Sequence, residues 1–226
     1  PVGERLTLRV NGEVAHSAPV ADRKDARNSE IEGRHSQAGG VAATFAIDAQ
    51  QSIEAGWTGG TERRFYDTVS STKGGYRSTY DIDRSQAHVG WQGRFEGWRG
   101  RVQAYRSEID IVNSASNGVT ATRPQNLLDE VIDGHATVKL GGHQVTFGGE
   151  WRDETLTNAG LTTGRDSATH KALFVQDEVA LGSSLMLTGG LRADNHELFG
   201  SEVSPRAYLV WEASPALVVK GGFGHA

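Results

Sequence analysis

Apolar and polar side chains alternate with a period of two residues along much of the chain. Two such runs near the start are separated by a short polar break: Val41, Ala43, Phe45 and Ile47, and then Ile53, Ala55 and Trp57. Alternation of this kind is typical of strands that have one apolar and one polar face. Together the two runs predict an antiparallel hairpin.

The same alternation continues to the end of the chain, whereas no long segment shows the apolar spacing of a helix. A Gly141-Gly142 pair between two of the runs is a typical sequence for a tight hairpin. The pattern predicts an all-β protein of about eleven strands. The expected strands cover residues 6–10, 41–47, 53–57, 87–91, 98–105, 132–140, 145–151, 173–181, 185–194, 204–211 and 217–224.

The connections between these strands alternate between long and short. Long connections are expected at residues 13–33, 60–78 and 153–169, and short ones at residues 48–51 and 141–142. An outer-membrane barrel has this arrangement, because its periplasmic turns are short and its extracellular loops are longer. A soluble sandwich has no reason to place all its long loops at one end. We therefore predict an antiparallel transmembrane β-barrel.

Aromatic side chains lie where such a barrel needs them. Trp91, Trp98 and Trp211 lie close to the short turns, and Trp151 and Tyr105 lie near the opposite strand ends. Amphipathic rings favour the boundary between membrane and water, and barrels carry an aromatic belt at each edge. The aromatic residues therefore predict two belts.

About eleven strands are too few for a closed barrel of this kind. Bacterial single-chain barrels have an even number of strands and close on themselves, because an open edge in lipid leaves backbone groups without hydrogen bonds. Residues 218–224 have the sequence of a strand still in progress. We expect residues 1–226 to be the middle portion of a larger barrel.

Composition narrows the class of protein further. The 23 Lys and Arg residues against 28 Asp and Glu residues give a net charge of −5 at pH 7, which argues against a nucleic-acid partner. The chain has no cysteine, which excludes disulfides, thiolate metal sites and cysteine nucleophiles. The longest uncharged apolar stretch, residues 39–47, is far shorter than the roughly 20 residues of a membrane helix.

The C-terminal half of the chain carries motifs of a known family. They are Gly148-Gly149-Glu150-Trp151, Phe174-Val175-Gln176-Asp177-Glu178, Gly190-Leu191-Arg192 followed by Asp194, Ser204-Pro205-Arg206, and Lys220 with the glycines after it. These motifs resemble the barrel of TonB-dependent outer-membrane receptors, of the ferric-enterobactin and colicin receptor type. The likeness is good over residues 130–226 and only architectural before them.

The resemblance implies a segment of about eleven strands from a plugged barrel of roughly 22 strands, surrounded by outer-membrane lipid of a Gram-negative bacterium. It implies import of ferric siderophores of catecholate type, driven by the TonB energy-coupling complex acting on a plug domain that this sequence lacks. Iron is expected only inside the siderophore, so no cofactor or metal ligand is assigned. Colicins or phages are further partners that the resemblance implies for the loops.

A ferric catecholate is anionic and aromatic, so its site needs positive charge and flat rings. The expected connection 60–78 offers both, with four basic residues against Glu62 and Asp67, and charge and stacking would both favour an anionic aromatic ligand there. The connections 13–33 and 153–169 are net acidic. The candidate ligand-binding residues are Arg63, Arg64, Tyr66, Tyr76, Arg77 and Tyr80.

Two other classes of protein stay open, an outer-membrane barrel enzyme and a soluble β-sandwich binding module. Asp194 and His196 could share the rim of an enzyme barrel, but residues two apart on a strand face the same way by geometry alone. The sequence has no recognised hydrolase, zinc-protease or phosphate-loop motif, so no catalytic residue is assigned and we expect no enzyme. The acidic residues Asp129, Glu130 and Asp133 lack an EF-hand pattern and are interpreted as solvated.

Overall fold

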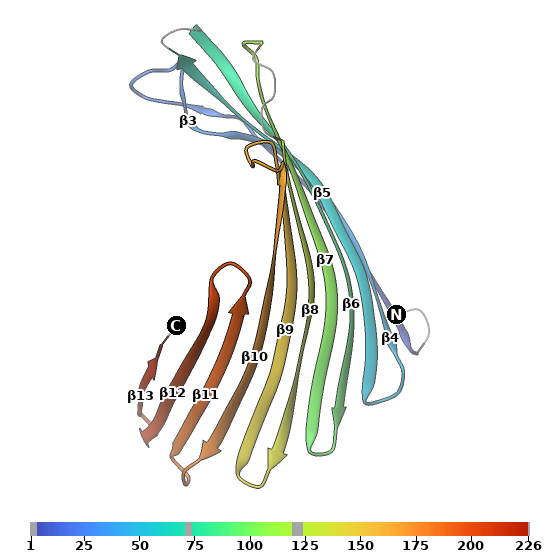
Figure 1. Ribbon diagram of the computed structural model, residues 1–226, viewed down its shortest axis with the longest axis vertical. Helices are drawn as coiled ribbons and strands as arrows, with labels where there is room; N and C mark the ends of the chain where they lie inside the picture. The colour runs from blue at the N-terminus through green and yellow to red at the C-terminus, as the bar shows by residue number, and fades with distance from the viewer. Residues whose placement is uncertain (1–3, 71–73, 119–123, 226) are drawn as a thin grey trace.

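The computed structural model describes residues 4–70, 74–118 and 124–225, and in them the chain forms one antiparallel sheet of eleven strands (Figure 1). Each strand pairs with its neighbour in sequence, except that β1 pairs with β4 because the hairpin β2–β3 lies in their connection. The strands are β1 (Leu6–Ser17), β2 (Val20–Ala21), β3 (Ser29–Ile31), β4 (Gly33–Ala46), β5 (Gln51–Ser70), β6 (Gly74–Phe95), β7 (Trp98–Ala115), β8 (Gln125–Leu140), β9 (His143–Asn158), β10 (Arg165–Ala180), β11 (Leu185–His196), β12 (Gly200–Ser214) and β13 (Leu217–Gly224). The predicted all-β antiparallel class is confirmed.

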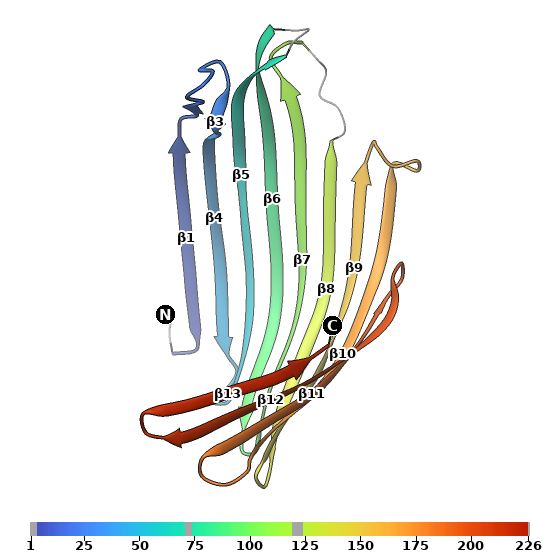
Figure 2. The same ribbon diagram turned by 90° about the vertical axis from the view of Figure 1, so that its left-hand side faces the viewer.

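The sheet is a single curved layer, as Figure 2 shows. One face, here called the apolar face, carries side chains such as Val102, Ile132 and Leu173, which are 51%, 52% and 71% exposed. The opposite face, here called the polar face, carries Arg152 and His170, which lie opposite each other in register. Since the described strands form no second stacked sheet over the apolar residues, the β-sandwich alternative is wrong.

The strands extend well beyond the ends that alternation predicts. The ladder between β5 and β6 runs without a shift from Gln51↔Gly93 to Ser70↔Gly74, so the connection expected at 60–78 is mostly strand. In the same way β1 and β4 extend into 13–33, and β9 and β10 extend into 153–169. These extensions carry many polar residues on both faces, which hides the period of two that marks a strand. No helix in the described part of the chain is long and apolar enough to cross a membrane.

The short turns lie together at one end of the sheet (Figure 1). Gly97 and Gly141 adopt positive φ angles of 78° and 62° in two of them, a conformation that costs glycine little. In the β4–β5 turn, Asp48 Oδ1 accepts hydrogen bonds from the backbone N–H groups of Gln50 (2.7 Å) and Gln51 (2.8 Å). The turn is thus closed by one side chain.

We expect Asp48→Ala to lower the unfolding temperature of the intact protein slightly at neutral pH. The hydrogen bond from Gln50 N–H is the main cause that lowers the pKa of Asp48 below its ordinary value of 3.8. The stabilisation is therefore present above that value and is lost as the pH falls through the lowered pKa. Melting curves at neutral and acidic pH should show the difference shrinking in acid. Gln50→Ala, which keeps both backbone donors, is the control, and an equal loss in both variants would contradict this role.

Aromatic rings mark two levels on the apolar face. The Trp57 ring lies against Gly59, and the Trp91 ring lies over Gly93, where a Cβ would be 2.6 Å from Trp91 Cζ2. Trp57 and Ile53, the partner of Trp91, are four residues apart along β5, which is roughly 13 Å at about 3.3 Å per residue. The two rings lean away from each other along the strands, because the Trp57 ring reaches the level of Gly59 and the Trp91 ring reaches that of Gly93.

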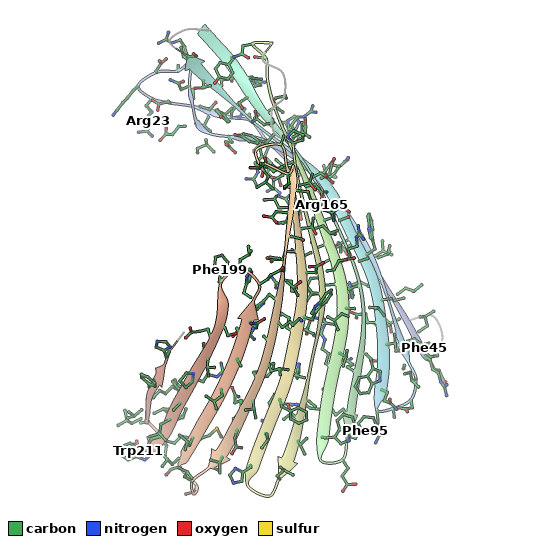
Figure 3. All side chains as sticks on the ribbon, viewed as in Figure 1. Arg23, Phe45, Phe95, Arg165, Phe199 and Trp211 are labelled. Carbon is green, nitrogen blue, oxygen red and sulfur yellow. The ribbon has the colours of Figure 1, made fainter. Side chains whose placement is uncertain are left out.

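The lower belt is confirmed, since the rings of Phe95 and Trp98 stack at 4.5 Å and Figure 3 shows Phe95 and Trp211 at the end with the short turns. One assignment to the upper belt is wrong. Tyr105 lies opposite Val131 and His88 on the polar face, because its position in β7 has the parity of Gln103 and not that of Val102.

Candidate functional site

The hairpin β5–β6 extends farther than the short turns require (Figure 1) and carries all six predicted ligand residues. We call residues 60–70 and 74–84 the β5–β6 extension. The segment around β3 fastens it, because the backbone N–H of Asp67 donates to Ser29 Oγ (2.9 Å) and that of Val69 donates to Asn28 Oδ1 (3.0 Å). These side chains accept hydrogen bonds from backbone N–H groups of β5 at positions beyond Phe65, where β4 no longer pairs with β5.

The structure divides the six predicted residues between the two faces of the extension. Side chains alternate along a strand, and cross-strand partners share a face. Arg63 therefore lies on the face of Trp57, the apolar face, and Arg77 lies there too because it is opposite Asp67. The predicted residues on the polar face are Arg64, Tyr66, Tyr76 and Tyr80.

Arg63 and Arg77 are each bound to a carboxylate. Arg63 Nε lies 2.6 Å from Asp81 Oδ1, and Arg77 donates to both oxygens of Asp67 at 2.9 and 2.8 Å. The Arg77 guanidinium also lies 5.0 Å from the centre of the Phe65 ring, a cation–π distance. The positive charge expected for this connection is therefore neutralised on the apolar face.

The polar face holds a group of charged residues whose proximity is not predicted from the sequence. The Glu62 side chain is 5% exposed and binds three arginines, each 45–48% exposed. Arg34 Nη2 lies 2.9 Å and Arg84 Nη1 3.5 Å from Glu62 Oε2, and Arg64 Nε donates to Glu62 Oε1. We call these four residues the arginine cluster. Three positive charges against one negative charge leave a net charge of +2.

Register brings the arginine cluster together from three strands. Arg34 of β4 lies opposite Arg64 of β5, and Arg84 of β6 lies opposite Gly60, two residues before Glu62. Because Gly60 has no side chain, the long Arg84 side chain has room to reach toward Glu62. Arg34, Glu62 and Arg84 border one hollow of the surface.

Tyrosine rings lie beside the arginine cluster on the same face. The rings of Tyr66 and Tyr80 are stacked, with centres 6.4 Å apart and planes inclined by 23°. Tyr80 lies directly opposite Arg64 in the ladder, and Tyr76 lies opposite Thr68 farther along the same face. The polar face therefore combines unneutralised positive charge with flat rings.

The Asp–His pair considered for an enzyme is not formed. Asp194 Oδ1 is 2.9 Å from His170 Nε2, and Asp194 also accepts hydrogen bonds from Arg192 at 2.9 and 3.0 Å. The His196 ring instead contacts the Phe199 ring, at 4.7 Å between centres. Asp194 thus belongs to a charge network on the polar face.

The acidic residues considered for calcium are separated. Asp129 and Asp133 share the polar face, but Glu130 lies on the apolar face, where Arg106 Nη1 is 3.3 Å from its carboxylate. In residues 4–70, 74–118 and 124–225, no three His, Asp or Glu side chains converge as metal ligands.

Comparison with known families matches nearly the whole chain. The sequence model of the family described as "TonB dependent receptor-like, beta-barrel" matches residues 23–226. The iron-regulated outer membrane virulence protein of Vibrio cholerae is 34% identical over 105 residues, which cover 45% of this chain and 16% of that protein. The ferric enterobactin receptor PirA of Pseudomonas aeruginosa is 31% identical over 101 residues, covering 36% of this chain and 14% of that receptor.

Solved structures share the fold. A mutant of the ferric enterobactin receptor PfeA from Pseudomonas aeruginosa, in complex with enterobactin, superposes with a TM-score of 0.85 at 17% identity over 99% of this chain and 40% of that one. The siderophore receptor PirA from Acinetobacter baumannii gives 0.77 at 12% identity over 99% and 38%. The chain thus spans less than half the length of these receptors, and at these identities the likeness shows the fold alone.

Proposed function

Because the chain belongs to the TonB-dependent receptor β-barrel family, we propose that it is part of a receptor that imports ferric siderophores of catecholate type. The relatives named above are an iron-regulated outer membrane virulence protein and a ferric enterobactin receptor. In such a barrel the apolar face meets lipid and the polar face lines the lumen. The complete receptor in this proposal has a plug domain on which the TonB complex acts.

The observation that carries the proposal is the arginine cluster with the stacked tyrosines beside it. A ferric catecholate is an anion built from flat aromatic rings. Guanidinium groups form charge-assisted hydrogen bonds with anionic oxygens, and tyrosine faces stack on aromatic rings. The proposed ligand residues are therefore Arg34, Arg64, Arg84, Tyr66, Tyr76 and Tyr80, all on the polar face.

Arg63 and Arg77 do not belong to this set, although both are positively charged and lie on the same hairpin. Both lie on the face that turns away from the lumen, and both already bind a carboxylate. They supply a matched control because they lie on the same hairpin and carry the same charge.

The test compares the two faces in the full-length receptor. Arg34, Arg64 and Arg84 are replaced together by Gln, along with Glu62→Gln, so that no buried carboxylate loses its partners. Binding of ferric enterobactin should weaken at least about 100-fold, since each charge-assisted contact contributes about 1.5 kcal/mol or more. The control, Arg63→Gln with Arg77→Gln, should change binding by no more than a few-fold. The opposite ranking, or equal losses, would overturn the proposed site.

A further inference from the structure

Two histidines lie opposite each other at the end of β1 and β4 that is farther from the short turns. His16 and His35 are partners in the ladder, and the centres of their rings are 4.2 Å apart with planes inclined by 39°. His35 is also the partner of Arg63 in β5, which places both imidazoles on the apolar face. We call His16 and His35 the histidine pair. The siderophore proposal does not use it.

The surroundings of the histidine pair are polar, although it lies on the apolar face. The same row continues with Arg63 and Asp81, and the next row toward the short turns carries Asp83. Charged side chains on this face are costly in contact with hydrocarbon, so this level lies beyond the lipid-facing part of the wall. Both histidines are exposed and border a hollow of about 590 Å³. In the proposed receptor the plug fills the lumen on the opposite face and leaves the pair uncovered.

Both imidazoles are free to bind a ligand. Neither side chain makes a hydrogen bond or an ion pair with any residue in the part of the chain that the structure describes. His35 lies beside Arg63 in the row, but Arg63 Nε is 2.6 Å from Asp81 Oδ1, which compensates its charge. A cation that approaches the histidine pair therefore meets little repulsion.

The spacing of the two rings suits a single metal ion. A zinc ion lies about 2.1 Å from an imidazole nitrogen, so two such nitrogens on a tetrahedral ion are about 3.4 Å apart. Rings whose centres are 4.2 Å apart can reach this separation by rotation of the side chains alone. Phe65 limits that rotation, because its ring meets the His35 ring edge-on at 5.1 Å and is itself buried. The histidine pair is thus held close to the geometry that a shared ion requires.

We propose that the histidine pair binds a divalent transition-metal ion, with water in the remaining coordination positions. Imidazole is a ligand that suits zinc, copper and nickel ions, whereas magnesium, calcium and manganese ions prefer oxygen ligands. For a given set of ligands the affinity rises from Mn²⁺ to Cu²⁺ and falls again at Zn²⁺. Cu²⁺ is therefore the ion that should bind most tightly. A bound ion would also join β1 to β4 at the two ends of the connection that carries the β2–β3 hairpin.

The test measures binding of Cu²⁺ to the full-length receptor by titration calorimetry. His16→Gln and His35→Gln should each weaken binding at least about tenfold, because the remaining imidazole then lacks a second one held beside it. The double variant should lose no more than either single variant, since one ion needs both rings. The electron paramagnetic resonance spectrum of bound Cu²⁺ should show coupling to two nitrogens in the unaltered receptor and to fewer in each variant.

The matched control is His196→Gln, because His196 also lies opposite a histidine, His170, in a ladder. Those ring centres are 5.9 Å apart, and His170 Nε2 is already 2.9 Å from Asp194 Oδ1, so this variant should bind Cu²⁺ unchanged. Unchanged Cu²⁺ affinity in His16→Gln or His35→Gln, an equal loss in His196→Gln, or tighter binding of Mn²⁺ than of Cu²⁺ would overturn the site. None of these results depends on siderophore binding, so the two proposals can fail separately.

Discussion

Replacing Gly148 with alanine is expected to disrupt the pairing of β8, β9 and β10 in the assembled receptor. Gly148 lies on the polar face between His135 and Phe174. A Cβ at this position would overlap the backbone carbonyl oxygen of Gly134 and lie 2.8 Å from both His135 Cβ and Phe174 Cζ. A carbonyl held in a neighbouring strand cannot turn aside as a side chain can, so the strands would have to separate. Overpacking of this kind costs about 1–3 kcal/mol or more.

The control for this prediction is Gly189→Ala in β11. Gly189 also lies within a strand, but no described atom lies within 4 Å of a Cβ built there. Folding would be followed by the heat-dependent electrophoretic mobility of the receptor and by its urea unfolding midpoint. Gly148→Ala should lower the midpoint and the yield of folded barrel, whereas Gly189→Ala should leave both near the wild-type values. Equal behaviour of the two variants would contradict the close approach seen at Gly148.

The membrane-spanning part of the wall could be predicted from sequence because lipid imposes a strict pattern. One side of each strand must be apolar and the other is free to be polar, so runs such as residues 41–47 and 53–57 alternate clearly. The short turns mark one end of each of these strands. From β4 to β13, each strand of the sheet pairs with the next strand in the chain, and β1 pairs with β4. The order of the strands in the sequence therefore nearly determines the topology of the sheet.

The sequence pattern predicts a loop for the β5–β6 extension because this segment lies beyond the lipid-facing part of the wall. With water on both sides there is no apolar parity, and residues 60–70 show no alternation of apolar and polar residues. The ladder continues all the same, since its hydrogen bonds join backbone groups and depend little on side-chain polarity. The short hairpin β2–β3 was missed for a similar reason, as two and three residues carry no readable period.

The arginine cluster could have been found by extending the register of the hairpins. The pairs Ala46↔Ser52 and Arg34↔Arg64 belong to one unbroken ladder, so the turn at 47–50 fixes the partner of Arg64. This extrapolation requires that the β4–β5 ladder contains no bulge over more than ten residues. A single sequence does not show whether a bulge is present. Charge composition pointed to the right segment but could not divide it into two faces. Arg63 and Arg77 were selected on composition alone.

Glu62 connects the stability of the β5–β6 extension to the arrangement of its arginines. Its carboxylate is almost fully buried and is the shared partner of Arg34, Arg64 and Arg84. We expect Glu62→Gln to loosen the extension, because three neighbouring cations would lose the charge that holds them together. Removing one member of a buried ion pair costs about 3–5 kcal/mol, and the partial exposure of the arginines reduces this to about 1–2 kcal/mol.

Amide hydrogen exchange of the full-length receptor measures the loss of stability of the β5–β6 extension directly. A local loss of about 1.4 kcal/mol should make the backbone amides of the extension exchange roughly tenfold faster, with the membrane-spanning amides unchanged. Asp81→Asn is the matched control, since it removes a carboxylate from an exposed pair with Arg63 on the opposite face, where an ion pair contributes little. Equal protection in the two variants would mean that the arginines hold their positions without Glu62, and their fixed geometry would then have to come from the strands alone.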